Sequence, residues 1–170
     1  MYRIWQFWKA ITARLTPPDW SEVERVLTPG QLVLFKKMTL SDRAHSCRVM
    51  QTLLEKGFED RQLMAAALLH DSGKSQHPLR FWERPIPVLM RYFKGGDQES
   101  VGDQPQKGWR RALVIARQHP EWGAVLAEDA GASPLTVWLI RNHQQAQPAQ
   151  HPHPRALEYL KALQEADNQS

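Results

Sequence analysis

The sequence predicts an all-α protein, built as a single-domain helical bundle. Apolar residues recur every three or four positions along most of the chain, the spacing that places them on one face of a helix. Capping residues and prolines precede several of these stretches, and glycines follow them. No stretch shows the period-two alternation of a half-buried strand bounded by turn residues. The length of 170 residues suits one domain of ordinary size.

Composition and charge exclude several classes of protein. Apolar residues make up 42% of the chain and charged residues 24%, which are values of a globular domain and not of a disordered or fibrous chain. The single cysteine, Cys47, excludes a disulfide framework and a cysteine zinc cluster. The net charge of +4 is too small to indicate nucleic-acid binding, so we expect no specific nucleic-acid partner. With no targeting or membrane-spanning segment visible, we expect a cytoplasmic protein.

Residues 1–16 are expected to form an amphipathic helix ahead of a single domain at 17–170. Pro17-Pro18 ends this helix. Its face either packs on the rest of the domain or, because basic residues flank it, makes a weak contact with an anionic membrane surface. The apolar face is rich in tryptophan and consists of Ile4, Trp5, Trp8, Ile11 and Leu15.

Four helices are expected between this segment and residue 75. The first two are short and are separated by Pro29-Gly30. The fourth is made largely of alanine and leucine, which favour helix over strand. In chain order the expected helices are 21–26, 31–37, Ser41 or Asp42 to Gly57, and Glu59 or Asp60 to Ser72-Gly73.

Residues at about 75–108 are expected to form an irregular insertion, because prolines and glycines interrupt this stretch repeatedly. Within it, 81–93 is expected to be a broken helix and 94–107 an exposed loop. The insertion is either a lid that selects substrate or a solvated basic loop.

Regular helices are expected again from residue 109. One is expected to end at His119 and the next to begin at Pro120, since proline suits the first turn of a helix. Ser133-Pro134 repeats this signal for the following helix. The expected ranges are 109–118, 120 to about 126, 135–143 and 155–166, with a polar loop at 144–154.

Candidate metal ligands stand near the ends of these helices. His70-Asp71 follows the most apolar helix, where the negative end of the helix dipole also favours a cation. Side chains from several helices can converge on one metal site in a bundle. Taken singly, each residue has an ordinary alternative, either a histidine that caps a helix or a solvated acid. The other candidates are His45, His119, His143 and Asp167.

Three segments carry the central pattern: Asp-Arg-Ala-His45-Ser-Cys-Arg-Val, Ala-Ala-Ala-Leu-Leu-His70-Asp71-Ser-Gly-Lys74 and Leu-Gln-Glu-Ala-Asp167-Asn. This pattern resembles the HD-domain superfamily of metal-dependent phosphohydrolases, with a helical fold, over about residues 31–168. His-Asp-Ser-Gly-Lys is similar to the His-Asp-Ile-Gly-Lys form of its motif. His119-Pro-Glu-Trp-Gly-Ala and Leu-Ile-Arg-Asn-His143-Gln resemble the two extra histidines of the subgroup that binds two metals.

The resemblance implies a cofactor of one or two divalent metal ions. Donors of nitrogen and oxygen without a thiolate suit iron, manganese, cobalt, nickel or magnesium. Asp71 would bridge the two ions. The first ion would be held by His45, His70, Asp71 and Asp167, and the second would be completed by His119 and His143.

The resemblance also implies a catalytic role for Asp71 and Lys74. Lys74 would contact the phosphate of the substrate, and Arg48, one turn from His45, would assist. The implied reaction is hydrolysis of a phosphate ester, of a nucleotide or a similar small phosphorylated compound, by metal-activated water. The sequence does not predict the oligomeric state.

Three features depart from the family pattern. The 47 residues between Asp71 and His119 exceed what the compact two-metal pattern needs. Gln144 follows His143 where many two-metal members have a second histidine, and the Gly-Tyr-Pro element of the cyclic-di-GMP phosphodiesterases is replaced by Gln-Gln-Ala-Gln-Pro. The alternative function is therefore a non-catalytic module that binds a metal or nucleotide and regulates. The remaining histidines, at 77, 151 and 153, are expected at the surface.

Overall fold

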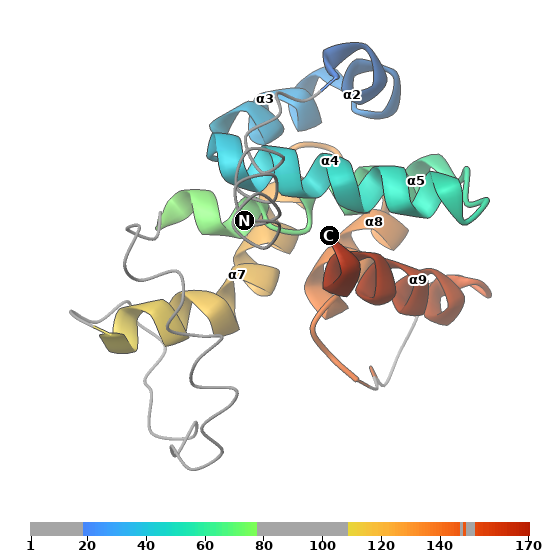
Figure 1. Ribbon diagram of the computed structural model, residues 1–170. Coiled ribbons are helices and arrows are strands. Elements are labelled where there is room, and N and C mark those ends of the chain that lie inside the picture. Colours follow the sequence, from blue (N-terminus) through green and yellow to red (C-terminus); the bar gives the residue numbers. More distant parts are fainter. Residues whose placement is uncertain (1–18, 78–108, 147, 149–151) are drawn as a thin grey trace, which may run out of the picture.

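The computed structural model describes every residue except 1–18, 78–108, 147 and 149–151 (Figure 1). The expected helix at 1–16 and nearly all of the expected insertion therefore lie outside the described residues. Within the described part of the chain the structure is helical and contains no strand, which confirms the all-α prediction. No helix of this part combines the length and the apolar character needed to cross a membrane.

The described helices pack around α5 at the centre of the molecule. α5 contacts five others, namely α2, α3, α4, α8 and α9. In Figure 1, α2 and α3 are seen on one side of α4 and α5, and α8 and α9 on the other, while α7 also contacts α3. In chain order the elements are α2 (Trp20–Val26), α3 (Pro29–Lys37), α4 (Leu40–Glu55), α5 (Arg61–Leu69), the 3-10 helix η1 (Ser72–Gln76), α7 (Trp109–Asp129), α8 (Pro134–Asn142) and α9 (Ala156–Gln169).

The central position of α5 follows from its sequence. Every residue from Leu63 to Leu69 is buried, so the helix is apolar on all sides and belongs in the core. The Asp60 side chain, one of the two candidates that the sequence offers, caps its first turn by accepting from two backbone N–H groups. The same carboxylate accepts a hydrogen bond from the Tyr159 hydroxyl at 3.2 Å, which attaches the first turn of α9 beside the start of α5.

Threonines, and not the expected residues, begin two helices. Thr28 caps α3 in a reciprocal capping box with Gln31, so Pro29 is the first residue of α3 instead of part of a break before it. Thr39 caps α4 in place of Ser41 or Asp42, and Asp42 accepts from its hydroxyl at 2.6 Å. The expected end at Gly57 is confirmed, and both Gly57 and Gly131 adopt the positive φ that glycine tolerates after a helix. The expected end at Ser72-Gly73 is wrong, because α5 ends at Leu69 and these two residues begin the 3-10 helix η1.

The expected break at Pro120 is wrong, since α7 runs through it as one helix of 21 residues. A proline inside a helix removes one backbone hydrogen bond and costs about 3 kcal/mol. Burial offsets this cost, because side chains on both sides of the proline lie in the core, each contributing on the order of 1 kcal/mol or more. They are Ala112, Val114, Ile115, Ala124 and Ala127.

A close contact between η1 and α7 places Asp71 beside the middle of α7. A Cβ on Gly73 would lie 2.1 Å from the His119 carbonyl oxygen and 2.7 Å from the Gly123 nitrogen. A Cβ on Gly123 would lie 3.1 Å from the Gly73 nitrogen and 3.2 Å from Ser72 Oγ. The two backbones can approach this closely only because both positions lack a side chain.

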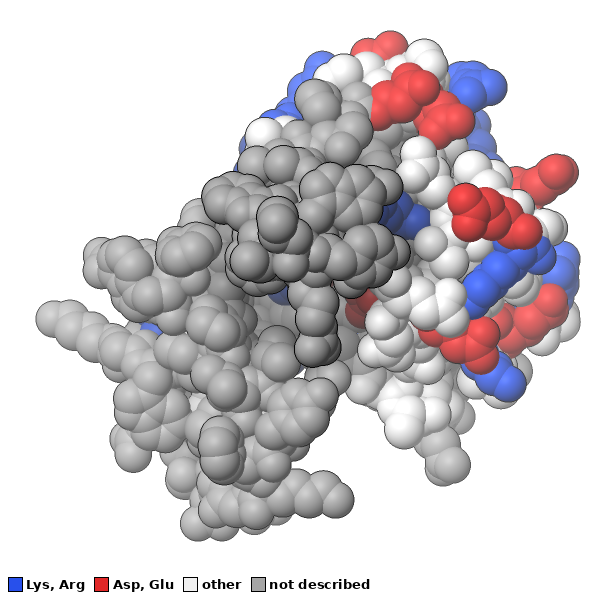
Figure 2. All heavy atoms as spheres, in the orientation of Figure 1, with Lys and Arg blue, Asp and Glu red and all other residues white. Residues whose placement is uncertain are grey.

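The part of the described surface visible in Figure 2 carries acidic and basic side chains that alternate. This distribution agrees with 22 basic and 18 acidic residues in the whole chain. Within its described residues, this face shows no extended basic track of the kind that follows a nucleic-acid backbone.

We expect Gly73→Ala to lower the free energy of unfolding by about 1–3 kcal/mol or more, because the new methyl group overlaps the backbone of α7. Gly123→Ala is the matched comparison. Its contacts are looser, and alanine regains up to about 1 kcal/mol of helix propensity. Urea unfolding of both variants measures the difference, and equal losses would contradict the close approach at Gly73.

Candidate metal centre

Six side chains from five parts of the fold meet at the buried end of α5. His70 caps α5 and Asp71 follows it, so both emerge where the helix ends. His143 is likewise the C-cap of α8. One position differs from expectation, because His119 lies inside the continuous α7. His45 lies in the second turn of α4. The sixth residue, Asp167, lies in the last turn of α9.

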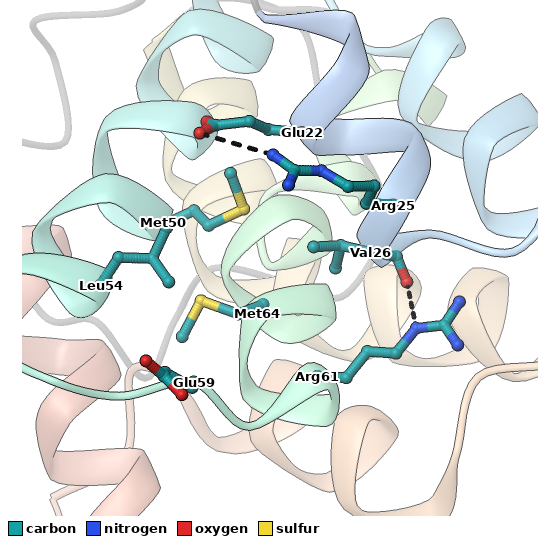
Figure 3. Close-up of a pocket in the computed structure, with 8 residues that line it drawn as sticks. All are labelled: Glu22, Arg25, Val26, Met50, Leu54, Glu59, Arg61 and Met64. Carbon is teal, nitrogen blue, oxygen red and sulfur yellow. Dashed lines mark hydrogen bonds and ion pairs between the residues drawn. The ribbon is translucent and has the colours of Figure 1, made fainter.

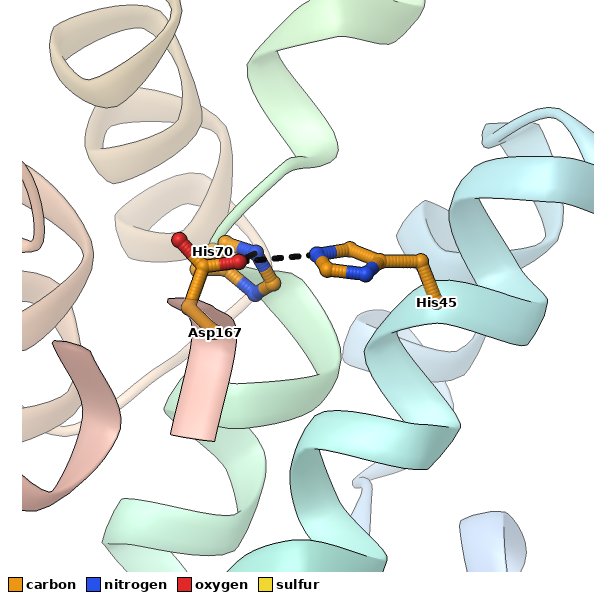
Figure 4. A group of neighbouring side chains, drawn as sticks. All are labelled: His45, His70 and Asp167. Carbon is orange, nitrogen blue, oxygen red and sulfur yellow. Dashed lines mark hydrogen bonds and ion pairs between the residues drawn. The ribbon is translucent and has the colours of Figure 1, made fainter. Parts of the chain in front are cut away.

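The outer group consists of His45, His70 and Asp167 (Figure 4). His45 Nε2 lies 2.8 Å from Asp167 Oδ1, and His70 Nε2 lies 3.5 Å from the same oxygen. The His45 and Asp167 side chains are 22% and 29% exposed, whereas that of His70 is 1% exposed. The outer group therefore opens to solvent on the side of α4 and α9.

The inner group consists of Asp71, His119 and His143, all three buried. His119 Nε2 lies 3.3 Å from Asp71 Oδ1 and 3.3 Å from His143 Nε2. The two groups adjoin, because Asp71 Oδ2 is 3.6 Å from His70 Nε2. Asp71 thus faces the inner group with one oxygen and the outer group with the other.

Three histidines of the site are oriented in the same way. Nδ1 of each ring forms a hydrogen bond with a backbone carbonyl of the preceding helical turn. The partners are Ala67 for His70 at 2.9 Å, Ile115 for His119 at 3.0 Å and Ile140 for His143 at 2.7 Å. A neutral ring that donates from Nδ1 carries its lone pair on Nε2. Metal-binding histidines are commonly held in this way by a hydrogen bond to their other nitrogen.

The nitrogen and oxygen atoms that meet in the site fit the ligands of divalent cations. His119 Nε2 and His143 Nε2 face one another as acceptors, so a proton or a cation is needed between them. Among the described residues, nothing makes a hydrogen bond to the buried His70 Nε2. Ligands of one first-row ion, each about 2.1 Å from it, lie about 3–4 Å apart, and the site's contacts of 2.8–3.6 Å are of this size.

Two histidines of the site, His70 and His143, have pKa values shifted in opposite directions. Burial favours the neutral form of His70, but the Asp71 and Asp167 carboxylates outweigh burial and raise its pKa to about 9. Burial, together with the charges of His70 and His119, lowers the pKa of His143 to about 3. At neutral pH His70 therefore carries the proton, and His143 is a neutral ring with a free lone pair.

Both carboxylates of the site remain ionised. Burial works to raise the pKa of Asp71, but the charges of Lys74, His70 and His119 hold it well below its usual range. Burial also opposes ionisation of Asp167, and the hydrogen bond with His45 and the charge of the neighbouring His70 lower its pKa despite this. Two anionic carboxylates beside three buried imidazoles form a ligand set of the kind that divalent cations prefer.

Lys74 lies beside the ligand groups, and Arg48 lies on the same helix as His45. Lys74 Nζ contacts Asp71 Oδ2 at 2.6 Å, and its side chain is 28% exposed. Burial favours a neutral Lys74, but Asp71 outweighs burial and raises the lysine pKa, so the ammonium stays charged. Arg48 is half-buried on α4, three residues after His45.

The structure also shows one contact that the sequence did not predict. The Gln144 amide nitrogen lies 3.4 Å from His119 Nε2, at the edge of the inner group.

Two histidines expected at the surface lie outside the site: His77 is half-buried against the Trp122 ring, and His153 Nδ1 accepts from the backbone of Arg155. His151 is outside the described residues.

A separate pocket of about 380 Å³ lies between α2, α4 and α5 (Figure 3). None of the six site residues lines it. Its lining combines methionines and aliphatic residues with two arginines and two glutamates, and Glu22 pairs with Arg25 there at 3.9 Å. Among the described residues, no histidine lines this pocket, and no pair of carboxylates is in contact there. The candidate metal ligands therefore lie at the end of α5 and not in this pocket.

Comparison with known protein families agrees with this geometry. The family model described as HD domain matches residues 43–169, which include all six side chains of the site. No curated protein and no solved structure matches the chain. Because the match covers most of the sequence, the chain belongs to the HD domain family.

Proposed function

We propose that the protein is a metal-dependent phosphohydrolase acting on a small phosphate ester, of a nucleotide or a similar phosphorylated compound. One observation carries the proposal: two groups of histidine and carboxylate donors adjoin through Asp71 at the buried end of α5. Two adjacent cations there would lower the pKa of a bound water and neutralise phosphoryl oxygens. Sites of this composition are suited to hydrolysis.

The proposed ligands divide between two ions. His45, His70 and Asp167 would hold the outer ion, and His119 and His143 the inner ion. Asp71 would lie between the two ions, as its two oxygens face different groups. All six candidate ligands are histidine nitrogens or aspartate oxygens, and the single cysteine, Cys47, is not among them. This set suits iron, manganese, cobalt, nickel or magnesium.

Lys74 is the proposed phosphate-binding residue. Its ammonium is charged and part-exposed at the mouth of the site, and its partner in the structure is Asp71. A cation bound to Asp71 would compete with this ion pair, leaving the ammonium able to bind a phosphate oxygen. Arg48, half-buried one turn after His45, is proposed to assist.

The exposure of the residues indicates where substrate enters. His45, Lys74 and Asp167 are each between a fifth and a third exposed, whereas the inner group is buried. A phosphate would therefore approach from the side of the outer group, with its ester group directed to solvent. This opening suits a small substrate whose phosphate alone enters the site.

We expect Asp71→Asn to reduce hydrolysis by about 100-fold or more, because the amide keeps the shape but loses the charge between the two groups. Asp129→Asn, an exposed aspartate at the end of α7, is the matched control. Product release from a panel of phosphomonoesters and phosphodiesters with Mn²⁺ measures the effect. Equal activity of both variants would refute the proposal.

A different outcome would favour the non-catalytic alternative. A wild-type protein that binds Mn²⁺, and whose melting temperature is raised by a nucleotide without any product, would be a regulatory binding module. Gln144 and the long segment between Asp71 and His119 are the departures that favour this alternative.

We expect Mn²⁺ binding near pH 7.5 to release about one proton, because His70, with its pKa of about 9, must lose its proton before Nε2 binds. The ligand loses a proton, so affinity rises with pH, by about tenfold per unit until about pH 9. Calorimetric titration in two buffers of different ionisation enthalpy counts the proton. Affinity that does not change between about pH 6.5 and 8 would contradict the raised pKa.

A further inference from the structure

The side chain of Gln144 reaches from the surface into the inner group. The residue is exposed and directly follows His143, yet its amide nitrogen lies 3.4 Å from Nε2 of the buried His119. Both backbone polar groups of the next residue, Gln145, are hydrogen-bonded. Its N–H donates to the Asn142 carbonyl and its carbonyl accepts from Gln164 Nε2, each at 2.8 Å. The short anchored turn fixes the direction in which Gln144 points.

The surroundings of His119 explain what the amide does in the structure. Because Nδ1 is committed to the Ile115 carbonyl, a neutral ring at this position would offer a lone pair at Nε2 of His119. Its other close neighbours, Asp71 Oδ1 and His143 Nε2, are acceptors as well. Among the described side chains in contact with this nitrogen, the Gln144 amide is therefore the one that supplies an N–H donor.

A cation in the inner group would reverse this requirement. The cation takes the Nε2 lone pair of His119, so the amide N–H₂ would then point at a positive charge. Rotation about the last side-chain bond exchanges the amide nitrogen and oxygen at nearly the same position. The oxygen is a good ligand for hard divalent cations.

We infer that Gln144 is the fourth donor of the inner group, through its amide oxygen, and that it sets the metal preference of that group. This inference rests on the metal binding proposed above. The inner group would then combine two imidazole nitrogens with a carboxylate and a neutral amide oxygen. Adding an oxygen donor without adding charge favours Mn²⁺ and Fe²⁺ over Zn²⁺.

The inference is tested by titrating the metal-free full chain with Mn²⁺. The electron paramagnetic resonance signal of the free ion measures how much Mn²⁺ is bound. We expect two ions per wild-type chain. In Gln144→Ala one of the two ions, the ion of the inner group, should bind about tenfold or more weakly, while the affinity for the other ion is unchanged. Competition with Zn²⁺ should show a lower preference for Mn²⁺ in this variant.

Two further variants separate a ligand from a structural residue. Gln145→Ala removes the same side chain at the neighbouring exposed position and should match the wild type. Gln144→Glu keeps an oxygen donor and should hold two ions. Urea unfolding of the metal-free variants should show that Gln144→Ala changes metal affinity without loss of the fold.

The outcomes distinguish this inference from the proposed function. Two ions bound equally well by wild type and Gln144→Ala would overturn the role of Gln144 and leave the metal centre in place. Equal weakening in Gln145→Ala, or loss of the inner ion in Gln144→Glu, would overturn it too, as would a wild-type chain that binds a single ion. A wild-type chain that binds no metal would overturn the proposed function itself.

Discussion

The burial of a polar helix end in the core is the constraint on which the rest of this structure depends. α5 is apolar on every side and occupies the centre of the domain, so its C-terminus cannot reach open solvent. His70 and Asp71 are 1% and 4% exposed where that helix ends. Removing an ionised carboxylate from water costs several kcal/mol unless partners compensate for the loss. The surrounding helices supply those partners, and this need places His119, His143 and Lys74 where they are.

Protons compensate the charges of the site when no cation is bound. His70 holds one between two carboxylates, and Lys74 lies against Asp71 with its own charge. His143 stays neutral a short distance away. His70 and His143 therefore differ in protonation at neutral pH although their rings are neighbours. A divalent cation bound here would supply this positive charge, and the Nδ1 hydrogen bonds that orient His70, His119 and His143 would stay in place.

The sequence predicted the fold well where local chemistry decides it. Asp60 and Ser133 begin helices, and glycines with positive φ end them, because these signals act within one turn of the chain. Pro120 misled the prediction, since the burial that keeps α7 continuous comes from residues distant in sequence. For the site, motif and helix position indicated the six side chains that meet at the end of α5. The contacts of Gln144 with His119 and of Gly73 with α7 depend on tertiary packing, which no local pattern reveals.

The contact between His45 and Asp167 joins residues that are 122 positions apart in the chain. A cation shared by these side chains would close nearly the whole domain into one loop, as a disulfide does in secreted proteins. Closure of a loop this long removes several kcal/mol of conformational freedom from the unfolded chain in the chain-entropy account. A protein with a single cysteine has no covalent means to this end. Its thermal stability would then depend on the supply of metal as well as on its sequence.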